Sequence, residues 1–221
     1  MRKNWWKLLA VMLLLYTLAY GLLVPIPDVA KQSMLEETIR NLFFHVPMWF
    51  AMILLLTISA VYSIKYLRNG DELCDAIAVE AINVGMVFGL MGAATGALWA
   101  KFTWGSYWPN DPKLNGVGIG LLIYAAYIIL RNGIEDPQKR ARVSAVYNVF
   151  AWPIFMVLIW ILPRINDSLH PGNGGNPGFN QYDLDSNLRM VFYPACIGWM
   201  MLGVWMLSLN FRMKKLEINT N

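Results

Sequence analysis

The sequence predicts an all-α integral membrane protein, a bundle of six transmembrane helices with both chain ends in the cytoplasm. Of the 221 residues, 57% are hydrophobic and only 14% are charged, whereas soluble domains carry about 25% charged residues. The apolar residues form long runs, and the basic residues fall in the short segments between them. Because the net charge of +4 is spread over these connectors, the composition argues against nucleic-acid binding.

Six apolar stretches are long enough, or nearly so, to cross a bilayer as helices, which takes roughly 17 to 25 residues. They are Leu8–Val24, Phe43–Tyr66, Ala78–Trp99, Leu114–Leu130, Val146–Leu162 and Met190–Leu209. The first stretch follows three basic residues and could alternatively be a signal peptide. Its length, and the lack of a small-x-small cleavage site after it, favour a retained helix. We therefore expect one six-span membrane domain covering residues 1–221.

The basic residues predict the orientation of this domain, because cytoplasmic connectors are enriched in Lys and Arg. Of the 18 Lys and Arg residues, twelve fall on the side that contains both chain ends and six on the other side. The richer side is assigned to the cytoplasm. The connectors 25–42, 100–113 and 163–189 are then expected outside. In the last of them, residues 171–178 are rich in Gly, Pro and Asn, which predicts a mobile loop.

The two histidines of the chain both fall in or beside these outer connectors. His45 lies at the outer start of the second span, just before Pro47, and His170 lies in the third outer connector. One interpretation is a pair of interfacial histidines with ordinary hydrogen bonds. The other is a pair of imidazole ligands to one metal centre.

If the histidines bind a metal, haem fits better than a bare ion. A non-haem site usually needs three or four protein ligands, and no Cys or Asp/Glu cluster accompanies the two histidines. In haem the porphyrin supplies the other four ligands. The two cysteines, Cys74 and Cys196, are not expected to form a disulfide and form no C-x-x-C-H motif, so covalent attachment of haem is not expected.

Aromatic residues crowd the second outer connector. Five of them occur within ten residues, namely Trp99, Phe102, Trp104, Tyr107 and Trp108. An interfacial aromatic belt needs only one or two at each helix end. Flat aromatic faces and indole N–H groups suit a large planar ligand with polar edges. This connector is therefore predicted to form a ligand platform.

The segment from Trp104 to Leu114 resembles the tryptophan-rich "WWD" signature of the haem-handling membrane proteins of cytochrome c maturation. That signature reads W-G-x-x-W-x-W-D, followed by a basic residue and Leu. The matching positions are Trp104, Gly105, Trp108, Asp111, Lys113 and Leu114, while Asn110 replaces a tryptophan. Within this group, the short six-span chain resembles the haem exporter protein C (CcmC) family, although Pro171 stands where Gln is expected after the second histidine.

The resemblance implies a non-covalent haem b site with His45 and His170 as axial ligands to iron. Trp104, Gly105, Trp108 and Asp111 would shape the platform around the macrocycle. The implied role is that of a carrier, not an enzyme, in the bacterial inner membrane. It would hold haem at the periplasmic face and deliver it to a periplasmic haem chaperone, and indirectly to apocytochrome c. Subunits of an ABC-type transporter and a small membrane protein are the implied partners.

Three alternative functions stay open at this point. A bis-histidine cytochrome b for electron transfer typically places its ligands inside the bundle. A haem-attaching cytochrome c synthetase subunit is usually longer, with more histidines. A cofactor-free permease would leave the tryptophans as an interfacial belt.

Two further patterns concern the glycines of the third span and the Lys and Arg residues on the outer side. Gly85, Gly89, Gly92 and Gly96 follow one face of the third span, which predicts close helix packing. Arg40, Lys101, Lys113 and Arg164 are outer cations that could pair with haem propionates or act as interfacial anchors.

Overall fold

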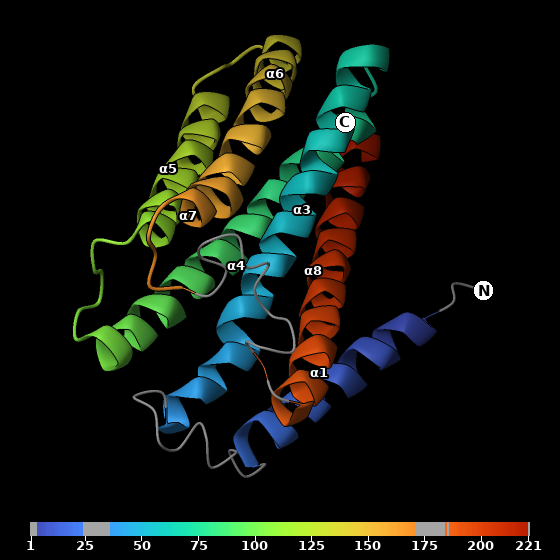
Figure 1. Cartoon of the computed structure of the whole chain (residues 1–221). Helices are drawn as coiled ribbons and strands as arrows, with labels where there is room; N and C mark the ends of the chain where they lie inside the picture. Colours follow the sequence, from blue (N-terminus) through green and yellow to red (C-terminus); the bar gives the residue numbers. More distant parts are fainter. Residues whose placement is uncertain (1–3, 24–35, 171–183, 185, 221) are drawn as a thin grey trace.

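The structure, a computed structural model, describes residues 4–23, 36–170, 184 and 186–220. Its regular elements are all helical in this part of the chain, and six helices are long and apolar enough to span a membrane (Figure 1). The chain is therefore an all-α, multi-pass membrane protein, as predicted. The loop predicted at residues 171–178 lies outside the described residues. The orientation in the membrane stays a prediction.

The helices follow the six predicted spans in order. They are α1 (Trp5–Leu23), the 3-10 helix η1 (Glu36–Asn41) with α3 (Leu42–Asn69), α4 (Glu72–Trp104), α5 (Pro112–Asn132), α6 (Pro137–Met156) with the π-helical η2 (Val157–Ile161) and α7 (Leu162–Ile165), and α8 (Ser186–Thr220). Each helix is longer than the apolar run that predicted it, or is extended by a short helix.

The helices therefore extend into the segments predicted as outer connectors. Residues 100–104 continue α4, so the connector before α5 spans 105–111 only. Helical residues also occupy 36–42 and parts of 163–189. A helix satisfies its backbone hydrogen bonds internally, so it can continue beyond the bilayer's apolar region until a residue ends it. Gly105, with a φ of 79°, ends α4, because glycine adopts this left-handed conformation without strain.

Aspartates cap the starts of three helices. Asp71 accepts a hydrogen bond from the backbone N–H of Leu73 before α4. Asp111 caps α5 and Asp136 caps α6, each directly before a proline in the first turn. These capping residues fix where each helix begins. Asp111 thereby places the last part of the predicted platform against the start of α5.

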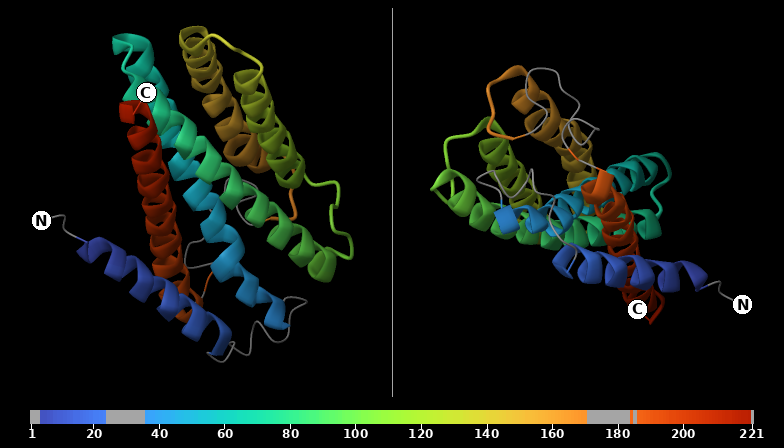
Figure 2. Two further views of the ribbon diagram at one scale, coloured as in Figure 1. Left: turned by 180° about the vertical axis from the view of Figure 1, so that it is seen from behind. Right: turned by 60° about the horizontal axis from the view of Figure 1, so that its bottom comes forward.

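The helices pack around α3, which contacts α4, α6 and α8. The pair α5–α6 lies on one side of α3 and α4, and α1 crosses α8 on the other side (Figures 1 and 2). The buried core runs between these helices and includes Met52, Leu55, Ile82 and Phe88. Both cysteines are free, in line with the sequence analysis, and both are buried.

Polar contacts join the helices at the end of the bundle opposite the histidines. The buried Asn148 of α6 donates to Ser59 and Ser63 of α3 at 2.8 and 2.9 Å. Arg131 of α5 pairs with both carboxylate oxygens of Asp75 on α4, at 3.0 and 2.6 Å. Hydrogen bonds of this kind hold membrane helices together where lipid removes the hydrophobic driving force.

The Arg131–Asp75 pair carries a stability prediction. Its side chains are only 14% and 16% exposed, so Asp75→Asn leaves a largely buried guanidinium without its counter-charge. We expect the free energy of unfolding to fall by about 3 kcal/mol, with no change at the histidine end. Thermal unfolding in detergent measures this, with Glu217→Gln as control, because the Glu217–Lys214 pair is exposed and worth less than about 1 kcal/mol. Equal losses in the two variants would contradict the prediction.

Candidate ligand-binding site

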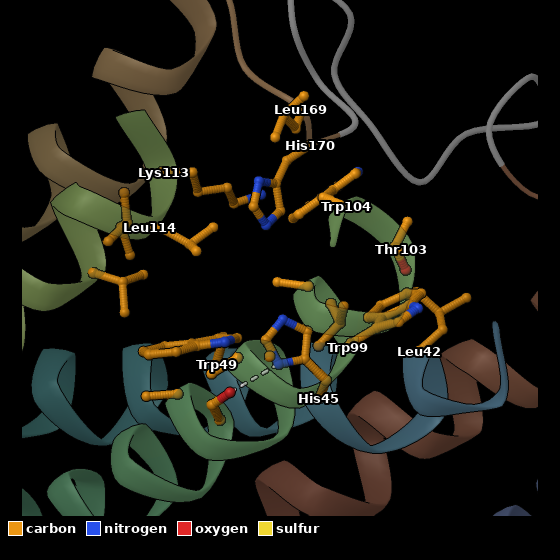
Figure 3. Close-up of a pocket in the computed structure, with 18 of the residues that line it drawn as sticks. Leu42, His45, Trp49, Trp99, Thr103, Trp104, Lys113, Leu114, Leu169 and His170 are labelled. Carbon is orange, nitrogen blue, oxygen red and sulfur yellow. Dashed lines mark hydrogen bonds between the residues drawn. The ribbon is translucent and has the colours of Figure 1, made fainter. Parts of the chain in front are cut away.

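A cavity of about 540 Å³ lies at the end of the bundle that carries both histidines. Its walls come from α3, α4, the start of α5, η2 and the segment after α7 (Figure 3). The volume lies within the roughly 300–1,000 Å³ of typical ligand pockets. The lining is mostly apolar and aromatic, and its polar side chains apart from tryptophans are His45, Thr103, Lys113 and His170. The structure thus brings together the two histidines, which are 125 residues apart in the chain.

His45 is the fourth residue of α3, and its ring points into the cavity (Figure 3). Its Nδ1 lies 2.9 Å from the backbone oxygen of Gly92 on α4. A carbonyl oxygen only accepts hydrogen bonds, so Nδ1 carries the proton and Nε2 keeps its lone pair. The Trp49 and Trp99 rings contact the imidazole edge-on, with centroids 6.3 and 5.9 Å away and interplanar angles of 80°. These contacts fix the plane of the ring.

Asp111 holds the segment that carries His170. Its carboxylate accepts from Ser168 Oγ at 2.8 Å, from the Leu169 N–H at 2.7 Å and from His170 Nδ1 at 3.1 Å. The same carboxylate caps α5 through two backbone N–H groups. It is 1% exposed and accepts five hydrogen bonds in all. Asp111 therefore joins the start of α5 to the histidine segment.

The Asp111 contact also sets which nitrogen of His170 faces the cavity. A carboxylate accepts, so Nδ1 donates and Nε2 is left with its lone pair. Burial lowers the pKa of His170, and the hydrogen bond to Asp111 offsets only part of this effect. Burial alone would raise the pKa of Asp111, but the hydrogen bonds from His170, Leu169 and Ser168 outweigh it and hold that pKa well below its ordinary value. The pair is accordingly a neutral imidazole beside an ionised carboxylate at neutral pH.

Three of the five aromatics of the predicted platform line the cavity, namely Trp99, Trp104 and Trp108. The Trp104 ring lies edge-on to His170, with centroids 4.9 Å apart. Phe102 and Tyr107 are 67% and 57% exposed and do not line the cavity. For Phe102 the cause is simple, because residues 99–104 are helical and only one face of a helix can point inward. Tyr107 lies in the connector that follows α4.

Asn110, the departure from the signature, lies in a chain of contacts that ends at Trp108. Its side-chain oxygen accepts from Asn115 at 2.9 Å, and Asn115 in turn accepts from the Trp108 indole N–H at 3.2 Å. Asn110 thus acts on the cavity through the orientation of Trp108.

Two predicted platform residues do not line the cavity. Gly105 and Asp111 are not among the lining residues. Gly105 ends α4 at a positive φ, and Asp111 supports His170 and α5. Their positions are those of supporting residues, one bending the chain and the other orienting a histidine.

Residues that the sequence did not mark as site residues complete the cavity. Trp49, Trp160, Gly92 and Gly96 all line it. Trp49 follows His45 by four residues, and this helical spacing could have placed both on one face. Trp160 lies on the π-helical turn η2, for which the sequence shows no signal. Such turns often occur at functional sites.

Comparisons with known proteins agree with the signature. The family "Heme exporter protein C" (CcmC) matches residues 2–220. The chain is similar to the "Heme exporter protein C" of Bradyrhizobium diazoefficiens, at 31% identity over 54% of this chain and 44% of that protein. The protein of the same name from Paracoccus denitrificans is 28% identical over 70% of this chain and 62% of its own length.

A second group of similar proteins carries another name. "Cytochrome c biogenesis protein CcsA" of Synechococcus sp. is 44% identical over 31% of this chain and 22% of that protein. The chain spans about half the length of the relatives that it matches first, with shares of 44%, 62% and 56%.

Proposed function

The chain belongs to the haem exporter protein C family, and we propose that it is a membrane haem carrier that holds haem between His45 and His170. The observation that carries this proposal is the pair of imidazoles on one cavity, each with Nδ1 bound to an acceptor on the protein. Metal-binding histidines commonly have this arrangement, because the second nitrogen then faces the metal. The proposed ligand is haem b, held without a covalent bond.

The lining of the cavity suits haem rather than a bare metal ion. Among the described residues, no group of three or more His, Cys, Asp and Glu side chains could hold an ion. Two imidazoles complete the coordination of an iron whose other four ligands belong to a porphyrin. Tryptophans from α3, α4, η2 and the connector before α5 provide flat apolar faces for the macrocycle.

Lys113 provides a charge for the polar edge of the ligand. It lies in the first turn of α5 and lines the cavity beside His170 (Figure 3). In the part of the chain that the structure describes, no ion pair joins Lys113 to a carboxylate. A haem propionate would supply that partner through a charge-assisted hydrogen bond. We propose Lys113 as the propionate-binding cation among the four outer cations.

We further propose that this end of the bundle faces the periplasm in the bacterial inner membrane, with both chain ends in the cytoplasm. The bias of Lys and Arg toward the opposite side supports this orientation. The names of the relatives, "Heme exporter protein C" and "Cytochrome c biogenesis protein CcsA", support a role in cytochrome c maturation. The carrier would pass haem to a periplasmic haem chaperone, and so indirectly to apocytochrome c. ABC-type transporter subunits and a small membrane protein are the proposed partners.

Absorption spectra of the purified protein test the ligand assignment. We expect the parent to show low-spin haem, and His45→Ala and His170→Ala each to lose that spectrum and at least about tenfold in haem affinity. Both variants should still unfold cooperatively on heating. A low-spin spectrum that survives either substitution would refute the assignment of that histidine.

A transfer assay separates the carrier from the alternative bis-histidine cytochrome. Haem-loaded protein in detergent is mixed with a soluble haem-binding acceptor or with a quinol. Haem loss to the acceptor supports the carrier. Stable haem that is reduced by the quinol without being lost would favour electron transfer instead.

A further inference from the structure

We propose that Gly92 and Gly96 of α4 form a slot that fixes the His45 imidazole with Nε2 toward the cavity. The inference rests on the proposed haem ligation by His45 and assigns a positioning role to two residues outside the histidine–tryptophan set. The slot is the space along α4 where the two glycines lack a side chain and aromatic rings of α3 lie against the backbone.

The four glycines of α4 all face α3. An added Cβ at Gly85 would meet Leu55 and Leu56, and one at Gly89 would meet Met52. An added Cβ at Gly92 would meet Trp49, and one at Gly96 would meet His45. The predicted close packing is thereby confirmed. Only the two glycines nearest the histidine end lie against rings.

At Gly96 the conflict is with the imidazole itself. A Cβ there would overlap His45 Cε1 and lie 3.0 and 3.2 Å from the two ring nitrogens. Neighbours this close must move. The His45 ring has little freedom to move. Trp49 and Trp99 contact it, and the backbone oxygen of Gly92 accepts a hydrogen bond from its Nδ1. A methyl group at position 96 therefore has to displace the proposed ligand.

At Gly92 the backbone acts in two ways. Its carbonyl oxygen accepts from His45 Nδ1 at 2.9 Å, which leaves Nε2 for the ligand. Its missing side chain makes room for Trp49, since a Cβ would lie 2.9 to 3.2 Å from three atoms of the indole. Both glycines also line the cavity. The α4 backbone at these two glycines thus holds the His45 imidazole and also forms part of the cavity wall.

The remaining glycines offer matched controls on the same helix face. At Gly85 an added Cβ would make only ordinary contacts at 3.5 Å or more. At Gly89 it would lie 2.6 Å from the Met52 sulfur and 2.9 Å from a terminal carbon of Leu121. These are flexible ends that can shift. Gly85→Ala therefore controls for the change of residue, and Gly89→Ala controls for a packing conflict away from the histidine.

The experiment compares Gly96→Ala with these controls in purified protein titrated with haem. We expect Gly96→Ala to lose the low-spin spectrum and at least about tenfold in affinity, while Gly85→Ala and Gly89→Ala keep the spectrum of the parent. Gly96→Ala in a His45→Ala background should cause no further loss, because both substitutions remove the same ligand. Thermal unfolding of Gly96→Ala should match that of Gly89→Ala.

The outcomes separate this inference from the function on which it rests. A parent that binds no haem, or a His45→Ala variant that stays low-spin, would overturn the proposed function or ligand. If the parent and His45→Ala behave as expected but Gly96→Ala keeps the low-spin spectrum, the slot is refuted. Equal spectral loss in Gly89→Ala and Gly96→Ala would also refute it, since general packing would then be the cause.

Discussion

Replacing Asp111 with asparagine is expected to abolish low-spin haem binding while leaving the fold intact. Asparagine caps a helix about as well as aspartate, so the start of α5 keeps its cap when the amide oxygen takes the place of Oδ1, which accepts from the Lys113 and Leu114 N–H groups. The amide oxygen can also still accept from one neighbour in the histidine segment. What the variant loses is the second acceptor oxygen, because an NH₂ group replaces it.

The physical reason lies in the tautomer of His170. With the carboxylate, Nδ1 donates to Asp111 Oδ1 at 3.1 Å and Nε2 keeps its lone pair. If the amide NH₂ faces the ring, it also opposes the capping N–H groups of Lys113 and Leu114, Nδ1 must become the acceptor and the proton moves to Nε2. If instead the amide oxygen faces the ring, the NH₂ group opposes the Leu169 N–H, which lies 2.7 Å from the other carboxylate oxygen. The first arrangement removes the lone pair of His170 Nε2. The second removes the hydrogen bond that holds Leu169, and with it the geometry of the segment that carries His170.

Asp136→Asn is the matched control for this prediction. Asp136 caps α6 through the Lys139 N–H at 2.6 Å, in the same aspartate–proline context but far along the chain from either histidine. We expect Asp136→Asn to keep the low-spin spectrum and Asp111→Asn to lose it, with at least about tenfold weaker haem binding. A normal spectrum in Asp111→Asn would show that the carboxylate does not control His170.

The sequence was sufficient to predict the six helices and their order, because long apolar runs leave few alternatives in a membrane. The apolar runs did not mark the helix ends, because Gly105 decides where α4 ends and the Asp111 cap decides where α5 begins. Hydropathy records only the part of a helix that is apolar. The apolar run of Ala78–Trp99 therefore underestimated a helix that continues to Trp104.

The candidate site was predictable only where one residue type carries the chemistry. His45 and His170 stand out as the two histidines of the chain, and the signature marks Trp104 and Trp108. The supporting contacts are tertiary, and their partners are far apart in the chain. Gly92 lies 47 residues from His45, and Asp111 lies 59 residues from His170. A glycine stripe reads as helix packing until the structure shows which side chain lies against each member.

Lys113→Met is expected to weaken haem binding by about tenfold to a hundredfold without changing the low-spin spectrum. The estimate follows from the roughly 1.5–3 kcal/mol of a hydrogen bond to a charged group. Methionine keeps most of the apolar length of the side chain and removes the charge. Since the iron ligands are untouched, the loss should appear in affinity alone.

A ligand change isolates the proposed propionate contact. Haem dimethyl ester lacks the carboxylates, so the parent should bind it more weakly than haem. Lys113→Met should bind the two ligands about equally, while Lys113→Arg should keep the preference of the parent. Lys101→Met is the control, because Lys101 is exposed beside Tyr107 and does not line the cavity. If Lys113→Met discriminates between haem and its ester as strongly as the parent does, another group binds the propionates, and Lys113 has only a general electrostatic effect on the cavity.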